Sequence, residues 1–182
     1  MNQPPFGSAQ GRELAERPRL GPFLTFAALF ALADQLLKWA VIASFQLRES
    51  RTVVPGFASL TYLRNRGGAF SFLSDLPEGW GRVFFILATL AALGFVLYLY
   101  RRNPPATRWG RWGLASVFGG GVGNLIDRAL RGEVIDFIDL HLKGHHWPAF
   151  NLADSGISVG VALLALDILF HRAPPPEDGA EA

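Results

Sequence analysis

Four long apolar stretches dominate the hydrophobic pattern of this chain. They cover about residues 23–45, 83–100, 109–130 and 153–170. The second stretch has 18 consecutive residues without a formal charge, and an α-helix of that length is about 27 Å long, close to the hydrocarbon thickness of a bilayer. The pattern therefore predicts an all-α membrane protein with four transmembrane helices.

The segments outside these stretches have a different character. Residues 52–63 are rich in β-branched and aromatic side chains, which predicts a small strand pair at the membrane surface. Residues 1–21 are rich in Pro, Gly and charge, and residues 172–182 include three consecutive prolines, so we expect flexible tails at both ends. The membrane domain is then expected to span residues 22–171.

The first stretch also permits a secretory signal interpretation. Residues 23–30 could be its apolar core, and Ala31-Leu32-Ala33 resembles a small-residue cleavage site. The apolar character resumes beyond Asp34 and Lys38, however, and the whole stretch is long enough to span a membrane. We therefore favour a transmembrane helix.

Composition agrees with a membrane protein. Half of the 182 residues are hydrophobic and 18% are charged, which is too little charge for an ordinary soluble surface. The chain has no cysteine, which excludes disulfides, thiolate metal sites and cysteine nucleophiles. The net charge of +2 comes from basic residues beside apolar stretches, and membrane orientation explains them better than nucleic-acid binding.

The arginines predict the orientation. The short link 101–111 carries four arginines in eleven residues, whereas the link 44–81 carries four in 38. Dense positive charge favours the cytoplasmic side. Both termini are then expected to be cytoplasmic, with the links 44–81 and 131–152 facing outward.

Several charged residues fall within the apolar stretches. Inserting one such residue near the bilayer centre costs roughly 2.5 to 3.5 kcal/mol of free energy, so its presence indicates a partner or a function. Asp34 and Lys38 are four residues apart, hence on one helix face, where they can form a structural ion pair. Asn124, Asp127 and Arg128 also share a face. They either cap the bundle or bind a substrate.

The third stretch contains a glycine run at 119–121 followed by Gly123. A phosphate-binding loop would require a following Gly-Lys-Ser or Gly-Lys-Thr, which the sequence lacks. Gly119 and Gly123 lie one helical turn apart, which favours close helix packing through a smooth glycine face.

Two aspartates stand at the outer ends of apolar stretches. Asp136 follows the third stretch and Asp154 opens the fourth. If they converge, both carboxylates cannot readily ionise, so one keeps a proton. Such a pair can activate a water and polarise a peptide carbonyl. On the residues alone, an interfacial acid or a helix N-cap at Asp154 remains the alternative.

Rival chemistries have weaker support. Potential metal ligands are Asp139, His141, His145 and His146, but Gly144 and Pro148 predict a loop there and the chain has no His-Glu-x-x-His pattern.

A serine–lysine pair would use Lys38 as the base and Ser71 or Ser155 as the nucleophile, yet Asp34 keeps Lys38 protonated. An ion-coupled transporter would also need buried polar residues, but the chain has no internal repeat. A purely structural membrane subunit is the third class.

The polar residues fall in five ordered blocks. They are Asp34-Gln35-x-x-Lys38, Asn65-Arg66-Gly67-Gly68-Ala69-Phe70-Ser71, Gly119-Gly120 through Gly123-Asn124-Leu125-Ile126-Asp127-Arg128, Gly132-x-Val134-x-Asp136-Phe137, and Phe150-Asn151-Leu152-Ala153-Asp154-Ser155. Together they resemble the signature of the lipoprotein signal peptidases, or bacterial signal peptidase II, across about residues 22–170. The departure is Gly68, where the family commonly has alanine.

The resemblance implies an intramembrane aspartyl endopeptidase with a small extracytoplasmic β-structure. It would cut prolipoproteins just before a cysteine that already carries diacylglycerol. The matching positions make Asp136 and Asp154 the catalytic pair. Substrate-binding positions would be Asn65, Asn124, Arg128 and Asn151, and structural support would come from Asp34, Lys38 and Asp127.

The same resemblance implies the setting of the enzyme. Its partners would be diacylglyceryl-prolipoprotein substrates and membrane lipid, without nucleic acid. We expect a monomer in the bacterial inner membrane, with the active site near the extracytoplasmic face and no metal or cofactor.

Overall fold

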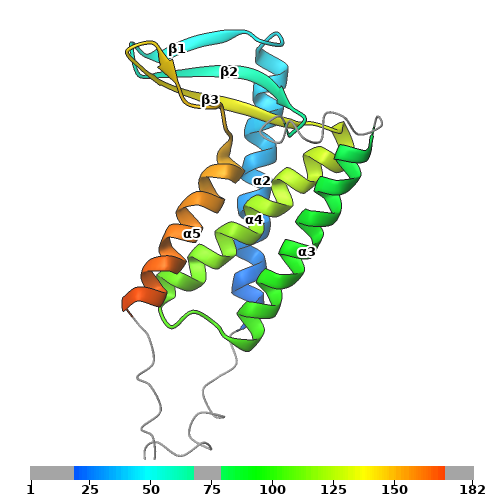
Figure 1. Ribbon diagram of the computed structural model, residues 1–182, viewed down its shortest axis with the longest axis vertical. Coiled ribbons are helices and arrows are strands. Elements are labelled where there is room, and N and C mark those ends of the chain that lie inside the picture. The colour runs from blue at the N-terminus through cyan, green and yellow to red at the C-terminus, as the bar shows by residue number, and fades with distance from the viewer. Residues whose placement is uncertain (1–18, 68–78, 171–182) are drawn as a thin grey trace, which may run out of the picture.

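The computed structural model describes residues 19–67 and 79–170. Four long helices run alternately up and down, and a small sheet covers one end of the bundle (Figure 1). The helices are α2 (Leu20–Ser44), α3 (Trp80–Arg102), α4 (Arg108–Arg131) and α5 (Leu152–Phe170). Each predicted apolar stretch is therefore a helix. The C-terminal tail and residues 1–18 of the N-terminal tail lie outside the described residues, and α2 begins at Leu20, within the predicted tail.

Local chemistry explains where the helices begin and end. The Thr107 side chain caps α4 by accepting a hydrogen bond from the Gly110 backbone N–H at 3.0 Å. Gly132 ends the same helix at a φ of 80°, in the left-handed region that glycine adopts without strain. Arg101 and Arg102 occupy the last turn of α3, where positive charge is favoured by the helix dipole.

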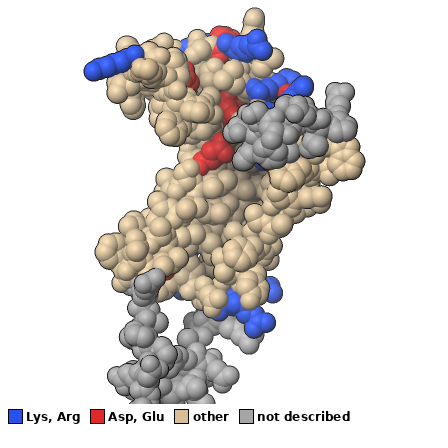
Figure 2. All heavy atoms as spheres, viewed as in Figure 1, with Lys and Arg blue, Asp and Glu red and all other residues tan. Residues whose placement is uncertain are grey.

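Three of the four helices are long and apolar enough to cross a membrane: α2, α3 and α5. Among the described residues, α4 does not join this set, and six glycines interrupt its apolar sequence. Large apolar side chains such as Leu29 and Leu87 are exposed on the outside of the bundle. On the face drawn in Figure 2, charged residues gather toward the two ends and leave the helices between them largely uncharged. The chain is therefore a mostly helical, multi-pass membrane protein.

The sheet is antiparallel, with strands in the order β1, β2, β3, β4. Its strands are β1 (Ser50–Val54), β2 (Ala58–Asn65), β3 (Val134–Leu142) and β4 (His145–His146). The predicted strand pair at 52–63 is confirmed by β1 and β2. The sequence interpretation missed β3 and β4, and the expected loop around Gly144 is a β-hairpin.

Glycines on α4 let its neighbours approach closely. A Cβ placed on Gly119 would lie 2.7 Å from the Ala27 carbonyl oxygen of α2, and one on Gly123 would lie 2.6 Å from the Asp34 carboxylate. A Cβ on Gly120 would lie 2.5 Å from the Ala153 carbonyl oxygen of α5. These distances are too short for real carbon contacts, so the predicted glycine-mediated packing is confirmed.

Gly120→Ala is expected to destabilise the fold by about 1 to 3 kcal/mol, because the added methyl group overpacks an interface bounded by backbone. Thermal unfolding of the purified protein in detergent measures the loss. Gly94→Ala on α3 is the matched control, since no described atom outside the adjoining helix backbone lies within 4 Å of its added Cβ. Equal melting temperatures for the two variants would contradict this packing argument.

The end of the bundle opposite the sheet has its own polar contact. Asp167 of α5 accepts hydrogen bonds from the backbone N–H groups of Ala106 at 3.0 Å and Thr107 at 2.9 Å, and also from the Thr107 hydroxyl. These bonds attach α5 to the start of α4. Asp167 therefore lies at the opposite end of α5 from Asp154.

Candidate active site

Polar side chains from five elements meet where the bundle joins the sheet. On the face shown in Figure 2, acidic residues are visible between the helices and the sheet. The residues predicted from sequence to catalyse, bind substrate or support the site come from all five elements: Asp34 and Lys38 on α2, Asn65 at the end of β2, Asn124, Asp127 and Arg128 on α4, Asp136 on β3, Asn151 just before α5, and Asp154 in its first turn.

Asn151 and Asp154 form a reciprocal cap at the start of α5. The Asn151 side-chain oxygen accepts from the Asp154 backbone N–H at 2.9 Å. The Asp154 carboxylate accepts from the Asn151 backbone N–H at 3.2 Å. This capping box satisfies two N–H groups that the first helical turn leaves unpaired. It also holds the Asp154 carboxylate at the positive end of the helix dipole.

Asp136 is nearly buried, with 3% of its surface exposed. One carboxylate oxygen accepts from the Asn151 side-chain amide at 2.8 Å and the other accepts from the Asn65 amide at 3.0 Å. Burial raises the pKa of Asp136 to about 6, and the nearby Asp154 charge adds to this rise, while the two amide hydrogen bonds lower it. Asp136 therefore binds a proton more readily than an ordinary aspartate.

Asn151 joins the two aspartates. Its side-chain amide donates to Asp136, and its backbone N–H donates to Asp154. Asn151 is itself fully buried, so its bonds are shielded from water. The structure thus places Asp136 and Asp154 on the two sides of a single asparagine.

A buried ion network lies beneath this pair. The Lys38 ammonium is 2.7 Å from an Asp34 carboxylate oxygen and 2.8 Å from one of Asp127, and it donates to the Asn124 side-chain oxygen at 3.0 Å. Lys38, Asp34 and Asp127 are all completely buried. The ammonium therefore uses its three protons on three acceptors. The predicted Asp34–Lys38 ion pair is present, and it extends to α4.

This network fixes the orientation of Asn124. An ammonium group can only donate, so the Asn124 oxygen must face Lys38. The Asn124 nitrogen is then directed to Asp154, to which it donates at 2.8 Å. The chain Lys38, Asn124, Asp154 connects α2 to the first turn of α5.

Both acids of the network also accept from backbone N–H groups. The second Asp34 oxygen accepts from the Ala153 backbone N–H at 2.9 Å, next to Asp154. The Asp127 oxygen that contacts Lys38 also accepts from the Ile135 backbone N–H at 3.2 Å, next to Asp136. Each acid of the ion network therefore holds the backbone beside one of the two aspartates.

Two participants were missed in the sequence interpretation. Gln35 donates to Asp127 at 3.1 Å, and Arg131 donates to the same side chain at 2.5 Å. Arg131 is four residues after Asp127, so helical spacing alone would have found it. With Arg131, two cations balance the charges of Asp34 and Asp127.

Asn65 and Arg128 lie at the edge of the site. The Asn65 oxygen accepts from the Gly67 backbone N–H at 2.8 Å while its amide holds Asp136. The Arg128 guanidinium carbon lies over the Phe85 ring, 5.0 Å from the ring centroid. The guanidinium also interacts electrostatically with Asp154, Asp127 and Asp136.

The structure separates the rival chemistries from this site. The Ser155 hydroxyl donates to the Asn151 carbonyl oxygen at 2.9 Å, whereas Lys38 is bonded to the two acids and Asn124. Ser71, the other serine considered, lies outside the described residues, as does the rest of its block from Gly68 onward. The histidine cluster forms on the β3–β4 hairpin and includes His141 and His146.

Known proteins are similar to this chain in sequence and in structure. Residues 26–170 match the family model described as signal peptidase (SPase) II. The chain is 47% identical over 153 residues to a lipoprotein signal peptidase of Geobacter metallireducens, which covers 84% of this chain and 93% of that protein. It is 44% identical over 150 residues to a lipoprotein signal peptidase of Ralstonia nicotianae, with coverages of 82% and 85%. A solved structure described as a bacterial membrane enzyme is 29% identical and superposes with a TM-score of 0.75 over 86% of this chain and 97% of that one.

Proposed function

This chain belongs to the signal peptidase II family, and on that premise we propose that it is an intramembrane aspartyl endopeptidase that removes signal peptides from prolipoproteins. Asp136 and Asp154 are the proposed catalytic pair. The observation that carries the proposal is their shared attachment to the buried Asn151.

The different surroundings of the two aspartates support different roles. Asp154, held at the start of α5 by the Asn151 backbone N–H, is suited to accept a proton from a water. Asp136, nearly buried and with a raised pKa, is suited to hold the proton. This division is the one that a general acid–base pair requires.

In the proposed reaction, Asp154 takes a proton from a water whose oxygen attacks the scissile carbonyl carbon. Asp136 donates its proton to the carbonyl oxygen, which gives a neutral tetrahedral diol. The diol then loses a hydroxyl proton to Asp136 as the carbonyl re-forms and the C–N bond breaks. Asp154 transfers its proton to the leaving nitrogen. Both aspartates thereby return to their starting states.

Four amide and guanidinium side chains are proposed to bind the substrate backbone and keep the pair in place. Asn65 and Asn151 donate to Asp136, Asn124 donates to Asp154, and Arg128 lies beside them. Asp34, Lys38 and Asp127 are proposed to support the site from within the bundle. Their bonds to Asn124 and to backbone beside each aspartate support this role.

We propose α4 as the fourth membrane-spanning helix, within a peptidase domain at residues 22–171. It packs against α2, α3 and α5 and lies among them in Figure 1. Its glycines and charges therefore face protein more than lipid, so it needs less apolar sequence than its neighbours.

The proposed orientation follows from the arginines. Four of them lie in the link from the end of α3 to the start of α4, at the end of the bundle opposite the sheet. Positive charge favours the cytoplasmic side, so the sheet and the aspartate pair lie toward the extracytoplasmic face of the inner membrane, and both termini are cytoplasmic. We propose that the enzyme is a monomer, because a single chain supplies all of the proposed site residues.

The site's place at the end of the bundle suits a substrate held in the bilayer. A signal helix with a diacylglyceryl cysteine brings its cleavage point to the membrane boundary. The test uses the purified full chain in liposomes with a synthetic prolipoprotein, with and without diacylglycerol on the cysteine. Mass spectrometry should find cleavage just before the lipidated cysteine. Cleavage elsewhere, or none, would contradict the proposal.

Activity is expected to fall as pH rises through about 6, because Asp136 then loses the proton that it must donate. The measurement is kcat/KM for prolipoprotein cleavage across pH. Asn65→Ala removes a hydrogen bond that lowers the pKa of Asp136, so the fall should move to higher pH even if the overall rate drops. An identical pH profile in the two enzymes would rule out Asp136 as the titrating group.

A further inference from the structure

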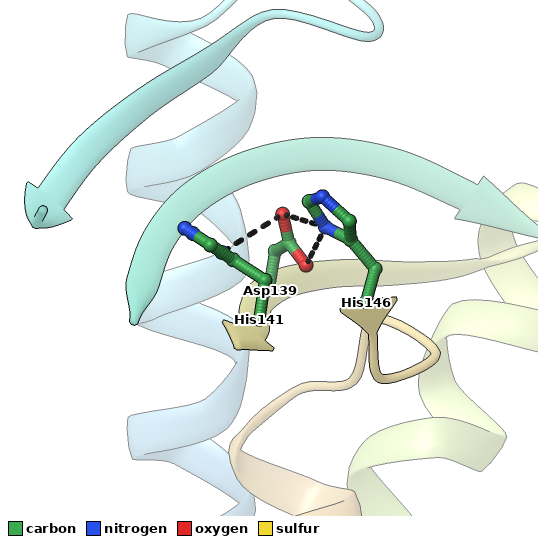
Figure 3. Close-up of side chains that lie close together, drawn as sticks. All are labelled: Asp139, His141 and His146. Carbon is green, nitrogen blue, oxygen red and sulfur yellow. Dashed lines mark hydrogen bonds and ion pairs between the residues drawn. The ribbon is translucent and has the colours of Figure 1, made fainter. Parts of the chain in front are cut away.

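We propose that Asp139, His141 and His146 form a binding site for a divalent cation, with Zn²⁺ the best match, on the outer sheet. The site is distinct from the aspartate pair. Figure 3 shows the three side chains converging at the β3–β4 hairpin.

The hairpin turn brings the two histidines together. Its two loop residues, Lys143 and Gly144, have φ values of 50° and 81°, as a tight two-residue turn of type I′ requires. The turn places Leu142 opposite His145 and therefore His141 opposite His146. Directly opposed residues of an antiparallel pair have Cβ atoms about 4.5 to 5.5 Å apart and point to the same face.

Strand alternation supplies the third ligand. Asp139 lies two residues before His141 on β3, so both side chains project from the same face. The neighbouring His145 projects from the other face of β4 and is not a member of the cluster.

The distances suit a single ion. One ligand atom from each residue can be chosen so that all three lie within 4.8 Å of one another. The His146 Nδ1 is 2.9 Å from one Asp139 oxygen, and the His141 Nδ1 is 3.8 Å from the other. Tetrahedral zinc with bonds of about 2.0 to 2.1 Å places its ligand atoms roughly 3.3 Å apart. Small side-chain rotations would reach that geometry.

An unsatisfied nitrogen points to a ligand. The Nδ1 atom of His141 is buried and has no hydrogen-bond partner among the described residues. Buried polar atoms are normally paired, so such an atom calls for an explanation. A hydrogen bond between His146 and Asp139 explains two of the three groups without a metal, but it leaves His141 unexplained. A shared cation would satisfy all three.

The donor set favours zinc. Two imidazoles and one carboxylate form a three-ligand zinc set, and water can fill the fourth position. The exposed side of the cluster is at His146, whose side chain is 59% exposed, whereas those of Asp139 and His141 are 15% and 16% exposed. The ion therefore has an entry path and a position for solvent.

The role of this site is structural. Asp139 is three residues after Asp136 on β3, so the two side chains face opposite sides of the strand. An ion at Asp139 would instead fasten β4 to β3, close to the backbone pair of Ile138 and Phe150. The chain then passes directly to Asn151. Zinc binding is thus expected to stabilise the segment between the two proposed catalytic aspartates.

The test is a calorimetric titration of the full-length, tag-free protein in detergent with ZnCl₂. Wild type should bind one Zn²⁺ at this site, and its melting temperature should rise with added zinc. His146→Ala and His141→Ala should each lower the affinity at least about tenfold and remove the melting-temperature rise. Asp139→Asn keeps the side-chain shape and should weaken binding in the same direction.

His145→Ala is the matched control because it removes a histidine from the same hairpin but from the other face. It should keep both the affinity and the melting-temperature rise of wild type. Circular dichroism of each variant checks that it is folded. Equal zinc affinity in wild type, His146→Ala and His141→Ala would overturn the proposal, as would an equal loss in His145→Ala. A prolipoprotein cleavage defect alone would bear on the aspartate pair and not on this site.

Discussion

Asp136→Asn and Asp154→Asn are each expected to reduce prolipoprotein cleavage by about 10³- to 10⁴-fold, at the upper end of the range for a general acid or base. An amide cannot take a proton from water, and it cannot donate the acid proton that polarises the carbonyl. Because each aspartate has a separate task, neither can replace the other. The asparagine side chain has nearly the same shape, so the fold should survive both changes.

The measurement is the single-turnover cleavage rate in liposomes, with the melting temperature as the check on folding. Glu49→Gln is the control: it is also an acid-to-amide change, but it lies in the exposed segment just before β1, where Glu49 pairs with Arg51. It should cleave at the wild-type rate. Near-normal cleavage by either aspartate variant would remove that residue from the mechanism. Loss of folding along with loss of cleavage would favour the structural-subunit interpretation.

Lys38→Met is expected to give the largest loss of stability, about 3 to 5 kcal/mol, because it leaves buried carboxylates without their cation. Methionine has a similar length but cannot donate to Asp34, Asp127 or Asn124. Both acids are completely buried, so water cannot compensate. Arg131 still pairs with Asp127 in this variant, whereas it does not pair with Asp34. The uncompensated charge of Asp34 is therefore the main source of the lost stability.

Thermal or denaturant unfolding in detergent measures this loss, and Lys143→Met is the control. Lys143 is the chain's other lysine and lies exposed in the β3–β4 turn, so its replacement should change stability little. Adding Asp34→Asn to Lys38→Met should restore part of the lost stability, because the uncompensated charge is removed. If the double variant is less stable than Lys38→Met alone, the ion-pair explanation is wrong.

The membrane fold was largely predictable because its signals are local. A run of apolar residues such as 83–100 forms a lipid-facing helix whatever elements surround it in the fold. The helices begin and end within a few residues of the predicted stretches. The ion pair of Asp34 and Lys38 was also predictable, since both residues lie on one turn of one helix.

The sheet was only half predictable. The β1–β2 pair is formed by neighbouring segments, and its β-branched composition is visible in 52–63. β3 pairs with β2 from about 70 residues away, with Val134 opposite Asn65, and no local pattern specifies that partner. For the same reason the sequence predicted only a loop around the histidines, whereas a two-residue turn pairs His141 with His146.

The sequence by itself determined the helices, their glycine-rich packing face and the residue types available for chemistry. The tertiary structure alone decided that Asn151, the cap of α5, also reaches Asp136 on β3, and that Lys38 orients Asn124 toward Asp154. The physical reason is the range of the interactions: hydrophobicity and capping act within a few turns of chain. Hydrogen bonds among buried side chains depend on where separate elements meet, which only the packed bundle and sheet specify.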